Sequence, residues 1–96
     1  MFVIEDEAHA EQHGEFSTLR AAIKELERRA SISWDQPPNL APCQGWRTCG
    51  RDYQVIEYDS STTPWRELRR IPYLRISAKG IEWLRPRGKT ANGPAA

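Results

Sequence analysis

The clearest hydrophobic pattern in the chain is one helical face. It consists of residues spaced about one turn apart: Leu19, Ala22, Ile23, Leu26 and Ala30. Ser17 or Thr18 can accept a hydrogen bond from a free amide of the first turn, and Arg28 and Arg29 suit the negative helix end. The sequence therefore predicts one amphipathic helix, with its large apolar residues buried against the rest of the protein.

Short apolar runs predict strands elsewhere. They cover residues 2–4, 53–58, 73–77 and 81–84, and we expect 53–58 to be the central strand. The last two runs are joined by Ala78-Lys79-Gly80, in which the glycine can take the positive φ of a bulged hairpin turn. Residues 5–15 have no hydrophobic periodicity, which predicts an exposed loop, and Pro72 marks the point beyond which extended geometry resumes.

The order strand, helix, long loop and three strands predicts an α+β fold. We expect a small, three- to four-stranded, mostly antiparallel sheet with one helix on one face. The length of 96 residues fits a single domain, which we place at residues 1–84. Residues 85–96 carry prolines and glycines but no large apolar residue, which predicts a disordered C-terminal tail.

The segment from Trp34 to Tyr53 predicts a long, ordered loop. It holds two tryptophans, both cysteines and three prolines. The prolines exclude a helix, and the tryptophans favour order because their apolar area must be covered. Both faces of the predicted strands carry apolar side chains, and one helix covers only one face. We therefore expect this loop to pack across the second face as a lid.

Charge and hydrophobicity limit the expected cellular compartment and the classes of partner. The formal net charge is only +1, but residues 1–42 hold eight acids and four bases, whereas residues 43–96 hold five acids and ten bases. No stretch approaches the roughly twenty apolar residues of a membrane span, and the N-terminus lacks the basic flank of a signal peptide. These features predict a cytoplasmic protein with no membrane partner.

The two cysteines leave several interpretations open. Cys43 and Cys49 are separated by five residues, which is wider than a typical zinc knuckle. They can be buried apolar thiols, a redox pair, or part of a metal site completed by His9 and His13. We expect no cofactor, no metal and no catalytic residue, so the small metal- or thiol-dependent protein is the alternative function.

Arginines interleaved with aromatic residues in the second half of the chain indicate a binding surface. Such a mixture can hold phosphates and stack on flat rings, although arginine stems also pack on aromatic faces for purely structural reasons. The favoured function is thus a non-enzymatic binding or interaction module for an anionic or planar partner, which can be a nucleic acid, a protein or a small ligand.

The site predicted for that partner lies in and beside the long loop. The expected ligand-binding residues are Asn39, Trp46, Arg47, Arg51 and Tyr53. Two guanidinium groups beside an indole would suit a carboxylate, a phosphate or a flat ring. The structural alternative is that Arg47 and Arg51 pair with Asp35, Asp52 or Asp59 and hold the loop onto the sheet.

The run PPNLAPCQGWRTCGRDY, with Trp34-Asp35 before it and Glu57-Tyr58-Asp59 after it, resembles small bacterial domains of unknown function. The resemblance covers about residues 1 to 84. It implies a stand-alone bacterial domain and carries no activity, cofactor or partner with it.

Overall fold

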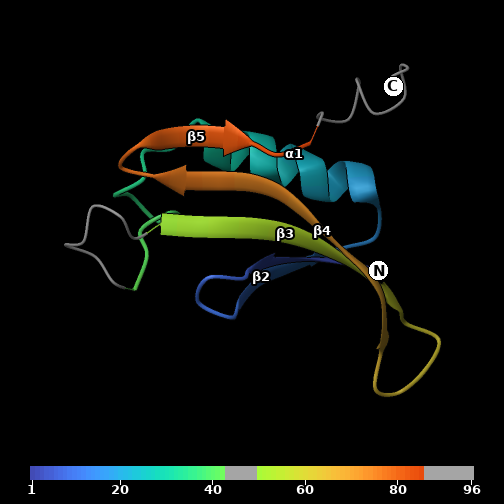
Figure 1. The fold of residues 1–96 in the computed structure, drawn as a ribbon. Coiled ribbons are helices and arrows are strands. Elements are labelled where there is room, and N and C mark those ends of the chain that lie inside the picture. The colour runs from blue at the N-terminus through green and yellow to red at the C-terminus, as the bar shows by residue number, and fades with distance from the viewer. Residues whose placement is uncertain (43–49, 86–96) are drawn as a thin grey trace.

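The computed structural model describes residues 1–42 and 50–85, which form one helix against a five-stranded antiparallel sheet (Figure 1). In chain order the elements are β1 (Phe2–Asp6), β2 (Glu11–Phe16), α1 (Leu19–Ala30), β3 (Gly50–Asp59), β4 (Arg66–Ser77) and β5 (Gly80–Trp83). The strands lie in the order β2-β1-β3-β4-β5, and every neighbouring pair is antiparallel. The predicted α+β class and the central position of β3 are confirmed, but the sheet has five strands rather than three or four.

Helix α1 forms where its hydrophobic spacing predicts it. The Thr18 hydroxyl accepts a hydrogen bond from the Ala21 amide (3.1 Å), which caps the first turn. Ile23 and Leu26 are buried, and Leu19 is half-buried against the same core. The core lies between this helix face and one face of the sheet, where Val55 on the central strand pairs in register with Ile4 on one side and Ile71 on the other.

The prediction of an exposed loop over residues 5–15 is wrong, because β2 occupies Glu11–Phe16. This edge strand pairs only with β1 and buries little apolar surface, so its sequence lacks the alternation by which strands are recognised. Gly14 adopts a φ of +121° beside an irregularity in the β1–β2 register, as expected at a bulge. Backbone pairing and polar contacts hold this strand in place.

The prediction that extended structure resumes only beyond Pro72 is also wrong, because β4 begins at Arg66 and continues through this proline. Pro72 pairs with Gln54 beside a register irregularity in the β3–β4 ladder, and β5 reaches only as far as Leu74. The strand is therefore an edge strand at Pro72, and prolines are tolerated at edges and bulges. The β3–β4 hairpin extends beyond the body of the sheet (Figure 1). The predicted hairpin after it is present, with Gly80 at a φ of +122°.

The described part of the long loop does not cover the second face of the sheet. Trp34 packs against the core on the helix side, and Asn39 is tied to the end of α1. On the second face Val3 and Ile56, which pair in register, are buried among polar neighbours. Residues 43–49 of the loop and residues 86–96 of the expected tail lie outside the described residues. Within the described residues, no helix has the length and apolar character to cross a membrane.

Candidate binding site

Three of the five predicted site residues are described, and two of them meet on the helix side of the sheet. The Tyr53 hydroxyl donates to the Asn39 side-chain oxygen (3.0 Å), and both residues are buried. The Asn39 amide nitrogen donates to the carbonyl oxygens of Arg29 and Ile32, each at 2.9 Å. Carbonyls at a helix end lack partners within the helix, so Asn39 satisfies this end of α1 and fixes the loop beside it.

Arg51, the third described residue, is bound to its surroundings on several sides. Its Nη1 donates to Asp6 Oδ2 (2.9 Å) and to Glu11, and its Nη2 donates to the Leu40 carbonyl (2.7 Å). The Arg51 side chain is 8% exposed and Asp6 is fully buried. Arg51 is thus a structural guanidinium that ties β3, the β1–β2 hairpin and the loop together, but its carboxylate partners are Asp6 and Glu11 rather than the predicted Asp35, Asp52 or Asp59. Trp46 and Arg47 lie outside the described residues, so the five-residue site stays a prediction.

The charges around Arg51 form a buried cluster that sets the protonation of its members. Burial acts to raise the pKa of Asp6, but hydrogen bonds from the Asp52 amide, Arg51 and His9 together lower it below its ordinary value. The hydrogen bond from Arg51 likewise lowers the pKa of Glu11. Asp6 and Glu11 therefore remain ionised beside the guanidinium, as a structural ion pair requires.

His13 completes this cluster in its neutral form. Arg29 Nη1 donates to His13 Nδ1 (2.8 Å), which leaves the ring proton on Nε2, 3.5 Å from Glu11. Burial, followed by the charges of Arg29 and Arg51, lowers the pKa of His13. The Tyr53 ring lies edge-on to the imidazole at 5.6 Å, with the Arg29 guanidinium 5.2 Å from the tyrosine centroid.

The metal alternative needs Cys43 and Cys49, which lie outside the described residues, so it stays untested. His9 Nδ1 contacts Asp6 Oδ2 at 2.6 Å, and His13 is held by Arg29. Within residues 1–42 and 50–85, no three histidine, cysteine or carboxylate side chains converge in a way that could hold a metal ion.

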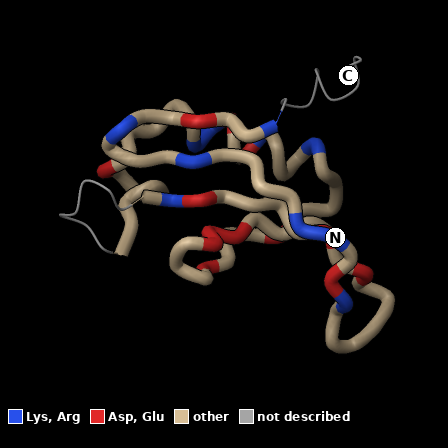
Figure 2. Tube along the Cα trace, in the orientation of Figure 1, with Lys and Arg blue, Asp and Glu red and all other residues tan. Residues whose placement is uncertain are grey.

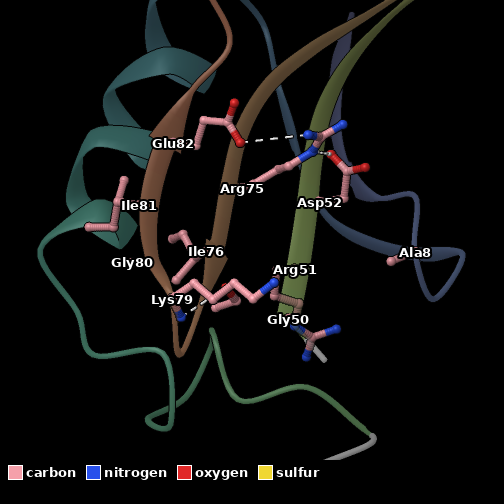
Figure 3. A pocket seen from close by; sticks show the side chains of 11 residues that line it. Ala8, Gly50, Arg51, Asp52, Arg75, Ile76, Lys79, Gly80, Ile81 and Glu82 are labelled. Atoms are coloured by element: carbon pink, nitrogen blue, oxygen red, sulfur yellow. Dashed lines mark hydrogen bonds and ion pairs between the residues drawn. The ribbon is translucent and has the colours of Figure 1, made fainter. Parts of the chain in front are cut away.

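A hollow of about 420 Å³ lies where β3 begins and β4 turns into β5, next to the Arg51 cluster (Figure 3). Its charged residues come from three neighbouring strands and the turn: Arg51 and Asp52 on β3, Arg75 on β4, Glu82 on β5 and Lys79 between the last two. Asp52 pairs in register with Arg75, and Arg75 with Glu82. The sheet therefore fixes an alternating row of charges along the wall of this hollow, which we call the hairpin-end hollow.

Two glycines shape the hairpin-end hollow. A side chain at Gly50 would place its Cβ 2.2 Å from the Ile76 carbonyl oxygen, so only glycine allows β3 and β4 to approach this closely. Gly80 takes the positive φ that turns β4 into β5, and the Ser77 hydroxyl accepts a hydrogen bond from the Lys79 amide (3.2 Å). Lys79 extends from this turn toward the start of β3 (Figure 3).

The cations of the hairpin-end hollow are held less tightly than Arg51, Arg69 and Arg70, each of which donates a hydrogen bond to a carboxylate. Arg75 Nε lies 3.8 Å from Asp52 Oδ1, and its Nη1 lies 3.6 Å from Glu82 Oε1, so neither contact is a hydrogen bond. By contrast, Arg69 Nε donates to Glu57 at 2.7 Å. Arg75 is 56% exposed, and Lys79 makes no ion pair with any described residue. Both cations thus have donors free for a ligand.

Asp52 is the matching acceptor. Its Oδ1 is buried and has no hydrogen-bond partner among the described residues. Burial raises the pKa of Asp52, and the carboxylates of Glu7, Asp6 and Glu82 raise it further, against the opposing charge of Arg75. The carboxyl group therefore lies in an excess of negative charge and would be stabilised by a hydrogen-bond donor.

A second hollow, of about 410 Å³, lies on the helix side of the same hairpin. It is lined by Trp34 and Ile32 and shares Ile76, Ser77, Gly80 and Ile81 with the first. Apolar and aromatic side chains with few polar groups favour a flat or aliphatic group at such a place. The β4–β5 turn therefore has a charged hollow on one side and an apolar one on the other.

Charge is distributed unevenly over the rest of the described surface. Acids gather along the β1–β2 hairpin (Figure 2), whereas β4 supplies the exposed arginines. Arg70, near the middle of β4, is bound by Glu67 (2.9 Å) and Glu5 (3.2 Å). Comparison of the chain with protein-family models, curated proteins and solved structures gives no match.

Arg51 borders the hairpin-end hollow and was among the predicted site residues, but Asp52, Arg75, Lys79 and Glu82 were not. The sequence indicates Arg75 only as one of the arginines in the second half of the chain, and Asp52 only as a turn residue or an ion-pair partner. A usable signal exists, because Asp52, Arg75 and Glu82 each stand beside apolar strand residues at alternating positions. Placing them side by side requires the β3–β4 register, which the sequence alone does not define.

Proposed function

We propose that this protein is a small, non-enzymatic binding module that holds an anionic group of its partner in the hairpin-end hollow. The observation that carries the proposal is the contrast between cations. Arg75 and Lys79 line a hollow of about 420 Å³ and make no side-chain hydrogen bond to a described residue, whereas Arg51 is fixed by two carboxylates. A guanidinium and an ammonium with free donors suit a carboxylate or a phosphate.

The test is an NMR titration of the whole chain with acetate and with inorganic phosphate. We expect the backbone amides of residues 75–82 and of Asp52 to shift saturably with either anion. A double variant, Arg75→Ala with Lys79→Ala, should lose these shifts. The matched control is Arg20→Ala with Lys24→Ala, which removes the same charge from two exposed helix residues and should keep them. Equal responses of the two double variants would contradict the proposal.

A nucleic acid is the other anionic partner that the sequence suggests, and the same variants address it. Several arginines of β4 lie beside carboxylates, which weakens the case for a continuous phosphate track. Binding of a single-stranded oligonucleotide at low salt that both double variants retain would place anion recognition elsewhere on the molecule. Binding lost only with Arg75 and Lys79 would identify the hollow as the contact for phosphates.

A further inference from the structure

We infer that the ligand held in the hairpin-end hollow is a small zwitterion of the amino-acid class, with a carboxylate and an ammonium group a few bonds apart. This inference rests on the proposed function, which requires only an anionic group, and adds the second charge. It draws on three features of the hollow: the alternation of its charges, the unpartnered oxygen of Asp52, and its size.

The alternating charges can bind both the carboxylate and the ammonium group of such a ligand. Asp52, Arg75 and Glu82 lie side by side on β3, β4 and β5, so a positive group stands between two negative ones (Figure 3). Neighbouring strands are about 4.8 Å apart. A ligand whose charges are separated by a few bonds can therefore place its carboxylate at Arg75 and Lys79 while its ammonium faces a carboxylate of the adjacent strand.

The Asp52 carboxyl favours a ligand that carries a positive charge in addition to its anionic group. Its buried Oδ1 has no hydrogen-bond partner among the described residues, and the Arg75 Nε is 3.8 Å away. A bound phosphate or acetate would bring further negative charge to a place that already holds Asp52 and Glu82. An ammonium group instead donates to the Asp52 carboxylate, whose side chain is 26% exposed, and offsets the charge.

The size of the hollow fits a small molecule and excludes a large one. About 420 Å³ lies near the low end of the range for ligand pockets. Gly50 and Gly80 line it without side chains, and Ile76 and Ile81 add apolar surface, so the charged side chains supply the polar recognition. A free amino acid is small enough for this volume and carries both charges. A polymer would contact the hollow only through an end group.

The experiment compares three probes on the wild-type chain by NMR: L-alanine, N-acetyl-L-alanine and L-alanine amide. N-acetyl-L-alanine lacks the ammonium charge and carries an added acetyl group, whereas L-alanine amide lacks the carboxylate charge and keeps the shape of the amino acid. We expect L-alanine to bind at least about tenfold tighter than either, because a hydrogen bond to a charged group contributes at least that factor. Equal affinities for L-alanine and N-acetyl-L-alanine would overturn the inference.

A variant isolates the carboxyl group. Asp52→Asn should bring L-alanine and N-acetyl-L-alanine to similar affinities, while Glu57→Gln, on the same strand but paired with Arg69 outside the hollow, should leave the tenfold preference intact. An Asp52→Asn chain that folds, by its thermal transition, and keeps the preference contradicts the role of this residue. If the variant does not fold, the comparison of probes on the wild type still decides the inference.

The two proposals fail differently. If acetate and phosphate shift the hollow but the zwitterion has no advantage, the inference is wrong and the anion-binding function stands. If acetate, phosphate and all three alanine probes leave residues 75–82 unchanged, the proposed function itself is wrong.

Discussion

The two faces of the sheet use the same kinds of residue for opposite purposes. On the helix side, Arg51 is 8% exposed and hydrogen-bonded to Asp6 and Glu11 beside an apolar core. On the other side, Arg75 is 56% exposed and lies at 3.6 to 3.8 Å from its carboxylates. These two arginines come from neighbouring strands at the same end of the sheet. Distance and burial, rather than residue type, separate a structural guanidinium from one available to a ligand.

This comparison explains why an arginine-rich sequence is ambiguous. A buried guanidinium must have its charge and most of its donors satisfied within the protein, since burial without partners is costly. An exposed one beside a hollow keeps its donors in reach of solvent and can exchange water for a ligand.

The largest expected effect concerns the apolar core of the helix side. Leu26 is fully buried between α1 and the sheet, so Leu26→Ala should lower the free energy of unfolding by about 2 to 5 kcal/mol. Ile81→Ala is the control, because Ile81 is 48% exposed and should lose far less. Chemical denaturation of both variants measures the difference. A denaturation midpoint for Leu26→Ala near that of the wild type would refute the helix–sheet packing.

The next effect contrasts the two arginines directly. Arg51→Gln leaves the buried Asp6 carboxylate without its guanidinium, and breaking a buried ion pair costs about 3 to 5 kcal/mol. Arg75→Gln removes an exposed side chain with long contacts, and its cost should stay within about 0.5 kcal/mol. Denaturation of the two variants at neutral pH gives both values. Similar losses for the two would remove the distinction between the faces.

A smaller effect concerns pH and the helix-side cluster. Because the pKa of His13 is lowered in the fold, the unfolded chain binds a proton to this residue more readily. Stability should therefore fall as pH decreases through the ordinary histidine value of about 6.5, and this loss continues down to the lowered pKa. His13→Gln should make the decline shallower between pH 7.5 and 5.5, a range of about two units around that value. A decline of unchanged slope in the variant would show that His13 is not held neutral by its burial beside Arg29 and Arg51.

The fold was predictable where burial dictates the sequence pattern. The helix has an apolar stripe at Leu19, Ile23 and Leu26, and β3 is rich in β-branched and aromatic residues, so both were predicted close to where they lie. Strand β2 was missed because an edge strand held by polar residues such as Glu11 and His13 has no such stripe. The start of β4 was predicted too late because Pro72 was read as the end of a non-extended segment. A strand tolerates this proline only at a bulged edge position, which depends on the neighbouring strands.

The candidate site was less predictable for the same physical reason. Tyr53 and Asn39 were expected to face a ligand, yet their hydrogen bond to each other and the contacts of Asn39 with the end of α1 arise from tertiary packing. Asp52 and Arg75 become neighbours only through the β3–β4 register. The sequence shows which charged residues the strands carry. Pairing between the strands determines which of these charges form ion pairs within the protein.

The most direct test follows the side-chain Nε–H signals of Arg51 and Arg75 in one NMR titration with acetate. We expect the Arg75 signal to shift saturably together with the amides of residues 75–82, while the Arg51 signal stays in place because its Nε is buried and its Nη1 is held by Asp6 and Glu11. A shift of Arg51 with no response from Arg75 would contradict this expectation, because the ligand would then engage the arginine assigned to structure.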